Sequence, residues 1–174
     1  MVVKDTLMPV NIEIKARLRD DGRRVRELAG ALATEAPTSM RQEDTFFHTP
    51  RGRLKLRVPT PGSAELIYYE RADDSGPRRS IYFAAPVADA AALRHVLEGA
   101  LGVRGVVRKT RELFLVHDTR IHIDDVEGIG RFLELEVMSS GTDDAAGRAR
   151  CHELMRALGV DESDLVERAY IDML

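Results

Sequence analysis

Charged side chains at alternate positions are the feature of this sequence best suited to chemistry. Glu13 and Lys15 are separated by one isoleucine, and Lys109 and Arg111 by one threonine. The same spacing recurs in three further sets: Arg53, Lys55 and Arg57; Arg120, His122 and Asp124; and Glu134 and Glu136. Because successive residues of a β-strand point to opposite sides, this spacing predicts strands with one charged face and one apolar face.

These charged faces are sorted by sign. Cations dominate the segments near residues 55 and 110, whereas carboxylates dominate the segment near residue 135. A solvated sheet face usually mixes the signs, because like charges directly across a ladder destabilise it. Arg and Lys bind phosphate oxygens, and carboxylates bind Mg²⁺ or Mn²⁺. The sorting therefore favours a site for a phosphate chain and a divalent metal over the alternative, an antiparallel sheet with one solvated side.

The composition suits one globular domain. The chain has 174 residues, of which 44% are hydrophobic, and a net charge of −3 that gives no general basic field for nucleic-acid binding. Its one cysteine, Cys151, excludes an internal disulfide and zinc sites built from several cysteines. No signal peptide and no apolar run of membrane length is recognisable, so we expect a cytoplasmic protein without membrane partners. We interpret residues 1–9 as a leader, with Met1 or Met8 as the start, and residues 10–174 as a single domain.

Periodicity and turn residues predict eight strands and four helices. The strands are expected over residues 10–18, 42–47, 53–58, 65–71, 79–84, 105–116, 120–125 and 131–138. The helices are expected over residues 22–34, from Asp89 to about residue 101, over 143–158 and over 164–173, with Asp20 or Asp21, Asp89 and Thr142 as caps. Short turns join most consecutive strands, which indicates an antiparallel sheet with helices packed on it. Eight strands are enough to close a barrel.

Several common functional motifs are absent. The sequence has no Walker A loop, no H-E-x-x-H motif and no nucleophile elbow. Its five histidines show no metal-ligand spacing, although His122 falls on a charged face. Tyr69 and Tyr82 are interpreted as packing residues, and Tyr170 as a residue that docks the final helix.

Six short motifs follow one another in a fixed order from residue 10 onwards. They are Asn11-Ile12-Glu13-Ile14-Lys15; the aromatic segment 42–47; Arg53-Leu54-Lys55-Leu56-Arg57; a strand ending in Arg71; Lys109-Thr110-Arg111; and Asp124 before a glycine turn and Glu134-Leu135-Glu136. Together they resemble the CYTH superfamily of class IV adenylyl cyclases and thiamine triphosphatases. The resemblance implies an α+β fold in which a closed eight-stranded antiparallel barrel forms a tunnel, with helices packed outside.

The resemblance also implies roles for individual residues. Catalytic roles fall to Glu13, Lys15 and Asp124, and metal ligation of Mg²⁺ or Mn²⁺ to Glu13, Asp124, Glu134 and Glu136. Triphosphate binding falls to Lys15, Lys55, Arg57, Arg71, Lys109, Arg111 and Arg120. The family motif begins with glutamate where this chain has Asn11, whose amide can ligate a metal but adds no negative charge.

The function expected from this site is metal-dependent hydrolysis of inorganic triphosphate, thiamine triphosphate or a nucleoside triphosphate. One alternative is a class IV-type adenylate cyclase that converts ATP to cyclic AMP and pyrophosphate. Two others are a triphosphate-binding module without turnover, which Asn11 motivates, and a structural barrel that binds a protein partner. A homodimer is possible.

Overall fold

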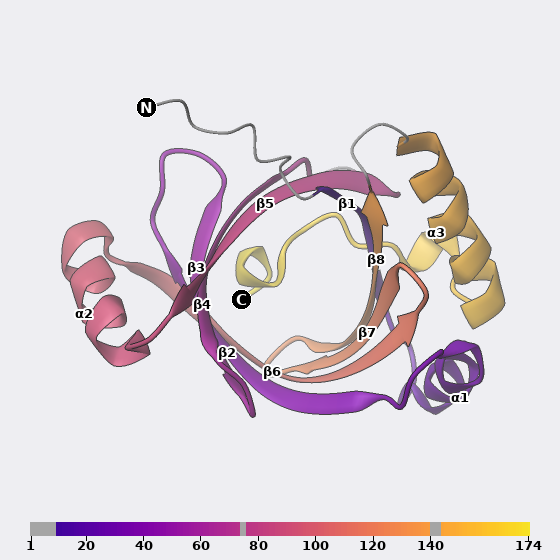
Figure 1. The fold of residues 1–174 in the computed structure, drawn as a ribbon. Helices are drawn as coiled ribbons and strands as arrows, with labels where there is room; N and C mark the ends of the chain where they lie inside the picture. Colours follow the sequence, from indigo (N-terminus) through magenta and orange to yellow (C-terminus); the bar gives the residue numbers. More distant parts are fainter. Residues whose placement is uncertain (1–9, 74–75, 140–143) are drawn as a thin grey trace.

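The strands form one closed antiparallel β-barrel (Figure 1). The computed structural model describes residues 10–73, 76–139 and 144–174. Within these residues the strand order around the barrel is β1-β5-β4-β3-β2-β6-β7-β8. The bounds are β1 Val10–Arg17, β2 Thr38–Phe47, β3 Arg53–Thr60, β4 Ala64–Arg71, β5 Arg78–Val87, β6 Val103–Val116, β7 Thr119–Val126 and β8 Gly130–Ser139. The predicted α+β fold with a closed eight-stranded barrel is thereby confirmed.

The barrel closes through β1, which pairs with strands far away in the sequence. Glu13 lies directly opposite Glu136 of β8, and Val10 lies opposite Ile81 of β5. A second long-range pairing joins β2 to β6, with Gln42 opposite Lys109. Closure leaves no strand edge unpaired around the ring, and it turns one face of every strand inward.

The main hydrophobic core lies outside the barrel. Ile12 and Ile14 of β1 and Leu133 and Leu135 of β8 are at most 1% exposed, and they pack with residues of two helices. These are the apolar faces predicted from the alternating pattern. The charged faces of the same strands consequently point into the barrel, where a small barrel would ordinarily be filled by apolar side chains.

Two of the three α-helices cover this outward apolar face (Figure 1). The helices are α1 Arg23–Leu32, α2 Ala90–Leu101 and α3 Asp144–Leu158. Helices α1 and α3 pack beside β1, β6 and β8, whereas α2 lies beside β2 and β3. At Gly147 of α3 an added Cβ would lie 2.7 Å from Ile12, so glycine is required for the close approach of α3 to the barrel. No helix in the described residues has the length and apolar character needed to span a membrane.

The predicted helix over residues 164–173 is wrong. The chain there forms two short 3-10 turns, Glu162–Asp164 and Tyr170–Asp172, joined by an extended stretch that enters the ring of strands (Figure 1). The Val166 amide donates to the Lys15 carbonyl, and Arg78 donates to the carbonyls of Val166 and Glu167. Because the barrel satisfies these backbone groups, the segment needs no helical hydrogen bonds. Residues 165–174 are called the C-terminal segment below.

Helix capping agrees with the sequence in part. The Asp89 carboxylate accepts from the Ala92 amide at 2.9 Å, which confirms it as the cap of α2. Gly22 is the N-cap of α1, and the predicted caps Asp20 and Asp21 instead accept from the amides of Gly22 and Arg23 in the preceding turn. The predicted cap Thr142 and the leader, residues 1–9, lie outside the described residues.

Candidate functional site

A charged cavity of about 380 Å³ lies inside the barrel. Its volume falls in the range typical of small-molecule sites. Ten of the eleven site residues predicted from the sequence line it, and the eleventh, Asp124, lies directly behind two of them. Among the described lining residues, seven are Lys or Arg and five are Asp or Glu. The cavity therefore carries a surplus of positive charge, which favours an anionic ligand.

The first group of cations comes from β3. Arg57 lies directly opposite Asp44 of β2 and forms a forked pair with it, at 2.8 Å for each bond. Lys55 donates to the same carboxylate at 3.0 Å. Burial alone would raise the pKa of Asp44, but Arg57 and Lys55 hold it well below its usual value. Burial, together with the neighbouring Arg57, lowers the pKa of Lys55 to about 8, against the opposing effect of Asp44.

The second group, on β6, repeats the same arrangement. Arg111 lies directly opposite Asp124 of β7, and both Arg111 and Lys109 donate to its carboxylate. Tyr170 donates a further hydrogen bond to Asp124 at 3.0 Å. Asp124 is fully buried, so burial alone would raise its pKa, but Arg111 and Lys109 hold the pKa below its usual value. In both groups an aspartate on the neighbouring strand fixes a Lys-x-Arg pair on the cavity wall.

Lys15 of β1 is a further cation of the cavity wall. Its ammonium group lies 3.3 Å from Glu134 and 3.8 Å from the centre of the Tyr170 ring. The ammonium also donates to the carbonyl of Arg168 in the C-terminal segment. Burial lowers the pKa of Lys15 to about 8, against the opposing effect of Glu134. The Tyr170 ring also lies close to a second cation, because the Lys109 ammonium group is 5.0 Å from its centre.

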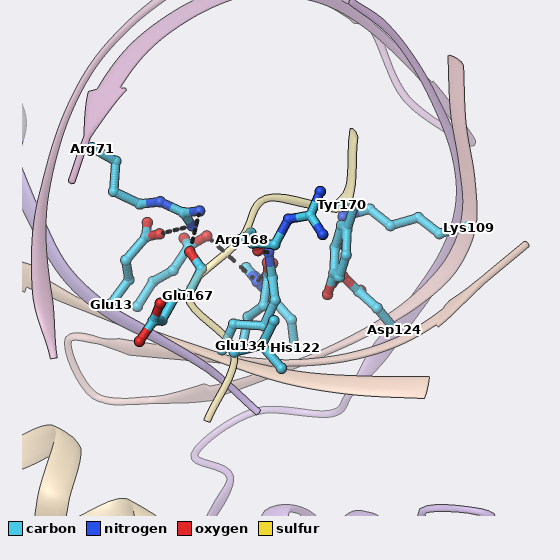
Figure 2. Close-up of polar contacts among 12 residues, drawn as sticks. Glu13, Arg71, Lys109, His122, Asp124, Glu134, Glu167, Arg168 and Tyr170 are labelled. Carbon is cyan, nitrogen blue, oxygen red and sulfur yellow. Dashed lines mark hydrogen bonds and ion pairs between the residues drawn. The ribbon is translucent and has the colours of Figure 1, made fainter. Parts of the chain in front are cut away.

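Glu13 and Arg71 form an ion pair, and in Figure 2 the C-terminal segment runs between this pair and Lys109. Their atoms are 2.7 Å apart, and the Arg71 side chain is 4% exposed. Arg71 also donates to the carbonyl of Glu167, so the C-terminal segment limits its movement. Arg120 differs from the other predicted cations: its side chain is 40% exposed and lies 3.4 Å from Glu136. Arg53 pairs with Asp73 and Asp172 and does not line the cavity.

Three side chains of β7 and β8 have the arrangement of a metal site. A ligand atom from each of His122, Glu134 and Glu136 lies within 4.8 Å of the others. The buried His122 Nδ1 has no hydrogen-bond partner, and it faces Glu136 at 3.6 Å and Glu134 at 3.9 Å. Burial alone would raise the pKa of both carboxyls, but neighbouring side chains lower it: Lys15 and Arg111 for Glu134, and chiefly His122 and Arg111 for Glu136. Two carboxylates and an unpartnered nitrogen fit a divalent metal.

Glu13 and Asp124, the other two predicted metal ligands, are engaged differently. The Asp124 oxygens accept from Lys109, Arg111 and Tyr170, so cations and a hydroxyl already surround them. Glu13 is held by Arg71, although it lies opposite Glu136 in the β1–β8 register. Asn11 lines the cavity, and its buried side-chain oxygen has no hydrogen-bond partner.

Sequence reasoning missed several residues of the site. Asp44 was noted only as part of the aromatic segment 42–47 and was given no role. Its alternation with Phe46 was a signal that the two share a strand face, and both line the cavity. Tyr69 and Tyr82 were interpreted as packing residues and also line the cavity. The prediction that Tyr170 docks a final helix is wrong. Tyr170 instead contacts Asp124 and two lysines. No local pattern could have placed it, because its position depends on the path of the C-terminal segment.

Comparison with known proteins agrees with this architecture. Residues 10–170 match the model of the CYTH domain. The chain is 30% identical to the adenylate cyclase CyaB of Aeromonas hydrophila, an alignment that covers 91% of this chain and 85% of the relative. Among solved structures, the PH1012 protein of Pyrococcus horikoshii superposes with a TM-score of 0.85 at 24% identity, covering 94% of this chain and 99% of the other. HpAC1 of Hippeastrum, described as having a dominant triphosphatase activity, superposes with a TM-score of 0.67 at 12% identity, over 93% and 91% of the two chains.

Proposed function

This chain belongs to the CYTH domain family, and from that membership and the charges inside its barrel we propose that it is a metal-dependent triphosphatase. The family includes adenylate cyclases and triphosphatases, which bind triphosphate substrates and depend on a metal. The proposed substrate is inorganic triphosphate, thiamine triphosphate or a nucleoside triphosphate. The proposed metal is Mg²⁺ or Mn²⁺.

One observation carries this proposal: two Lys-x-Arg pairs converge inside the barrel beside a pair of glutamates, one of which, Glu134, contacts Arg111. Strands β3 and β6, which carry the cations, are both neighbours of β2, so the two pairs lie on adjacent parts of one wall. The carboxylates of Glu134 and Glu136 come from β8, on the far side of β7. A chain of phosphates needs cations along its length and a metal at one end, and this cavity offers both.

The cations would bind and orient the phosphate chain. Arg57 and Arg111 would donate to phosphate oxygens with the N–H groups that Asp44 and Asp124 do not occupy, and Lys15, Lys55 and Lys109 supply compact positive charges. Arg71 and the more exposed Arg120 would contact the ends of the chain. Asp44 and Asp124 are proposed to position these cations, because each accepts hydrogen bonds from a Lys-x-Arg pair.

Glu134, Glu136 and a neighbouring carboxylate, Glu13, would hold the metal. When bound, the metal would neutralise charge on the phosphate oxygens. In hydrolysis, a water oxygen bonds to the terminal phosphorus while the bond from that phosphorus to the bridging oxygen breaks. Glu13 is proposed to accept the proton of the attacking water, and Lys15 to stabilise the charge that develops on the phosphate oxygens. Both side chains line the cavity.

Adenylate cyclase activity is the second candidate. The relative from Aeromonas hydrophila that is 30% identical carries that name. In addition, Ile67, Tyr69 and Tyr82 give the wall formed by β4 and β5 a partly apolar, aromatic lining that could accommodate a nucleoside. In this reaction the ribose 3′-hydroxyl would attack the α-phosphorus, and pyrophosphate would leave.

One set of assays separates these functions. Purified protein is incubated with Mg²⁺ or Mn²⁺ and, separately, with inorganic triphosphate, thiamine triphosphate and ATP. Release of orthophosphate supports the triphosphatase, whereas cyclic AMP together with pyrophosphate supports the cyclase. Binding of all three compounds without turnover would instead support a triphosphate-binding module and would refute both enzymatic proposals.

A further inference from the structure

His122 is a buried histidine, and its ring nitrogen Nδ1 makes no hydrogen bond within the described residues. Its side chain is 5% exposed. A buried polar atom without a hydrogen bond destabilises the folded state, so such atoms usually have a function or an absent partner. Carboxylate oxygens of Glu136 and Glu134 lie 3.6 and 3.9 Å from Nδ1.

A protonated imidazole would be one explanation of this geometry, but the surrounding charges disfavour it. Glu134 already pairs with Lys15 through one oxygen and with Arg111 through the other. Arg120 lies 3.4 Å from Glu136. An imidazolium would therefore add a fourth cation to a pair of carboxylates that three cations already contact. In the neutral Nδ1–H tautomer the ring would point a donor at carboxylate oxygens that lie 3.6 and 3.9 Å away, too far for a hydrogen bond. In the other neutral tautomer Nδ1 would direct its lone pair towards two carboxylates, which is favourable only if a cation lies between them.

We propose that His122 Nδ1 is a metal ligand and that, with Glu134 and Glu136, it makes this site selective for Mn²⁺ over Mg²⁺. This inference rests on the proposed function, because it concerns the metal that the proposed reaction requires. Mg²⁺ is bound almost entirely through oxygen. Imidazole nitrogen suits first-row transition metals, among which Mn²⁺ binds most weakly and also accepts oxygen ligands. One nitrogen among the ligands therefore adds affinity for Mn²⁺ and little for Mg²⁺.

The strand register explains why these three side chains meet. His122 lies directly opposite Glu134 in the β7–β8 ladder, and Glu136 is two residues further along the same inner face. Side chains directly opposite in an antiparallel pair have Cβ atoms about 5 Å apart, close enough to share one ion. The local sequence gave no such signal, because the histidine and the glutamates are on different strands.

The test is binding of Mn²⁺ alone, without substrate, followed by electron paramagnetic resonance. Pulsed measurements on the wild-type protein should detect coupling of the bound Mn²⁺ to a ¹⁴N nucleus of histidine. His122→Gln should lose that coupling and should raise the Kd for Mn²⁺ by about tenfold or more, the size of effect seen even when an outer metal partner is removed. The Kd for Mg²⁺, measured by competition, should change by less than about twofold, since Mg²⁺ gains little from the nitrogen.

A matched control is His95→Gln, because His95 is exposed on α2, away from the cavity. This variant should bind both metals as the wild-type protein does. Absence of ¹⁴N coupling in the wild-type protein, with Mn²⁺ bound, would overturn the inference without any variant. Equal losses of Mn²⁺ and Mg²⁺ affinity in His122→Gln would also overturn it. Triphosphate turnover is scored separately: turnover without ¹⁴N coupling leaves the proposed function intact, and ¹⁴N coupling without turnover contradicts only the proposed function.

Discussion

Lys15 of β1 lies directly opposite Glu134 of β8, and their side chains form an ion pair of 3.3 Å inside the barrel. The two residues are far apart in the sequence and become neighbours only because β1 and β8 close the barrel. The same lysine contacts the Tyr170 ring and the carbonyl of Arg168. Lys15 therefore contacts both the candidate metal ligand Glu134 and the C-terminal segment, and it lines the cavity proposed to bind the phosphates.

Replacement of Lys15 by methionine should weaken triphosphate binding. Lys15→Met keeps most of the side-chain length but removes the charge, and a hydrogen bond to a charged group contributes about 1.5–3 kcal/mol. We expect the Kd for inorganic triphosphate, measured by calorimetry without metal, to rise at least about tenfold. Arg23→Met, on the exposed surface of α1, is the control and should bind normally. Unchanged affinity in Lys15→Met would remove this residue from the site.

Arg57→Ala and Glu136→Gln should each cripple turnover. The first removes a forked phosphate donor and the second removes a carboxylate of the candidate metal group. Loss of one preorganised electrostatic contact typically costs on the order of 10²–10³ in kcat. Steady-state orthophosphate release measures the effect, with Glu98→Gln on α2 as the matched control. Near-normal rates in both variants would show that the reaction takes place elsewhere.

Asp44→Asn should destabilise the protein and make its stability depend on the anion. Asp44 is 2% exposed and pairs with both Lys55 and Arg57. Removing one partner of a buried ion pair costs about 3–5 kcal/mol, because the remaining charges lose their compensation. Inorganic triphosphate should restore part of this loss by binding the two freed cations. Thermal unfolding with and without triphosphate checks this, and a variant as stable as the wild-type protein would contradict it.

Titration of Lys55 should change the stability of the protein and its affinity for triphosphate in opposite directions as the pH rises. Burial lowers the pKa of Lys55 from 10.5 to about 8 in the folded protein. Between pH 10.5 and about pH 8, Lys55 holds fewer protons in the folded protein than in the unfolded chain. The contribution of Lys55 to the unfolding free energy therefore rises with pH across this range. That contribution is lost as the pH falls through about 8. Triphosphate, by contrast, binds the protonated lysine, so its affinity should fall above pH 8.

Lys55→Arg isolates this effect, because arginine stays protonated throughout this range. Calorimetric titrations with inorganic triphosphate in a chelator, at pH 7 and pH 9, should show a larger loss of affinity for the wild-type protein than for the variant. The comparison cancels the titration of the triphosphate itself. Equal losses in the two proteins would mean that Lys55 does not change its protonation on binding.

The hydroxyl and the ring of Tyr170 should have separable roles. Tyr170→Phe removes the hydrogen bond to Asp124 but keeps the ring beside Lys15 and Lys109. We expect it to lower the unfolding free energy by about 1 kcal/mol and to leave triphosphate affinity within about threefold. Tyr170→Leu also removes the cation–π contacts, so it should weaken triphosphate binding further. Equal affinities in the two variants would show that the ring does not position the lysines.

Much of the fold was predictable because strand alternation is a local property. The alternation of Glu13 and Lys15 with Ile12 and Ile14 placed the charges on one face and the apolar residues on the other, whichever strands became neighbours. The cap at Asp89 was likewise a local signal and was confirmed. The final helix was predicted wrongly, since the hydrogen bonds that decide the conformation of Val166 and Glu167 come from Lys15 and Arg78, far away in the sequence.

The sequence by itself determined which side chains are charged, which share a strand face and that eight strands could close a barrel, since period-two alternation needs no knowledge of the neighbouring strands. Only the tertiary structure decided the partners. It paired Asp44 with Lys55 and Arg57, Asp124 with Lys109 and Arg111, and His122 with two glutamates. The physical reason is that ion pairing and metal ligation act over a few ångströms, and barrel closure alone sets which side chains come that close.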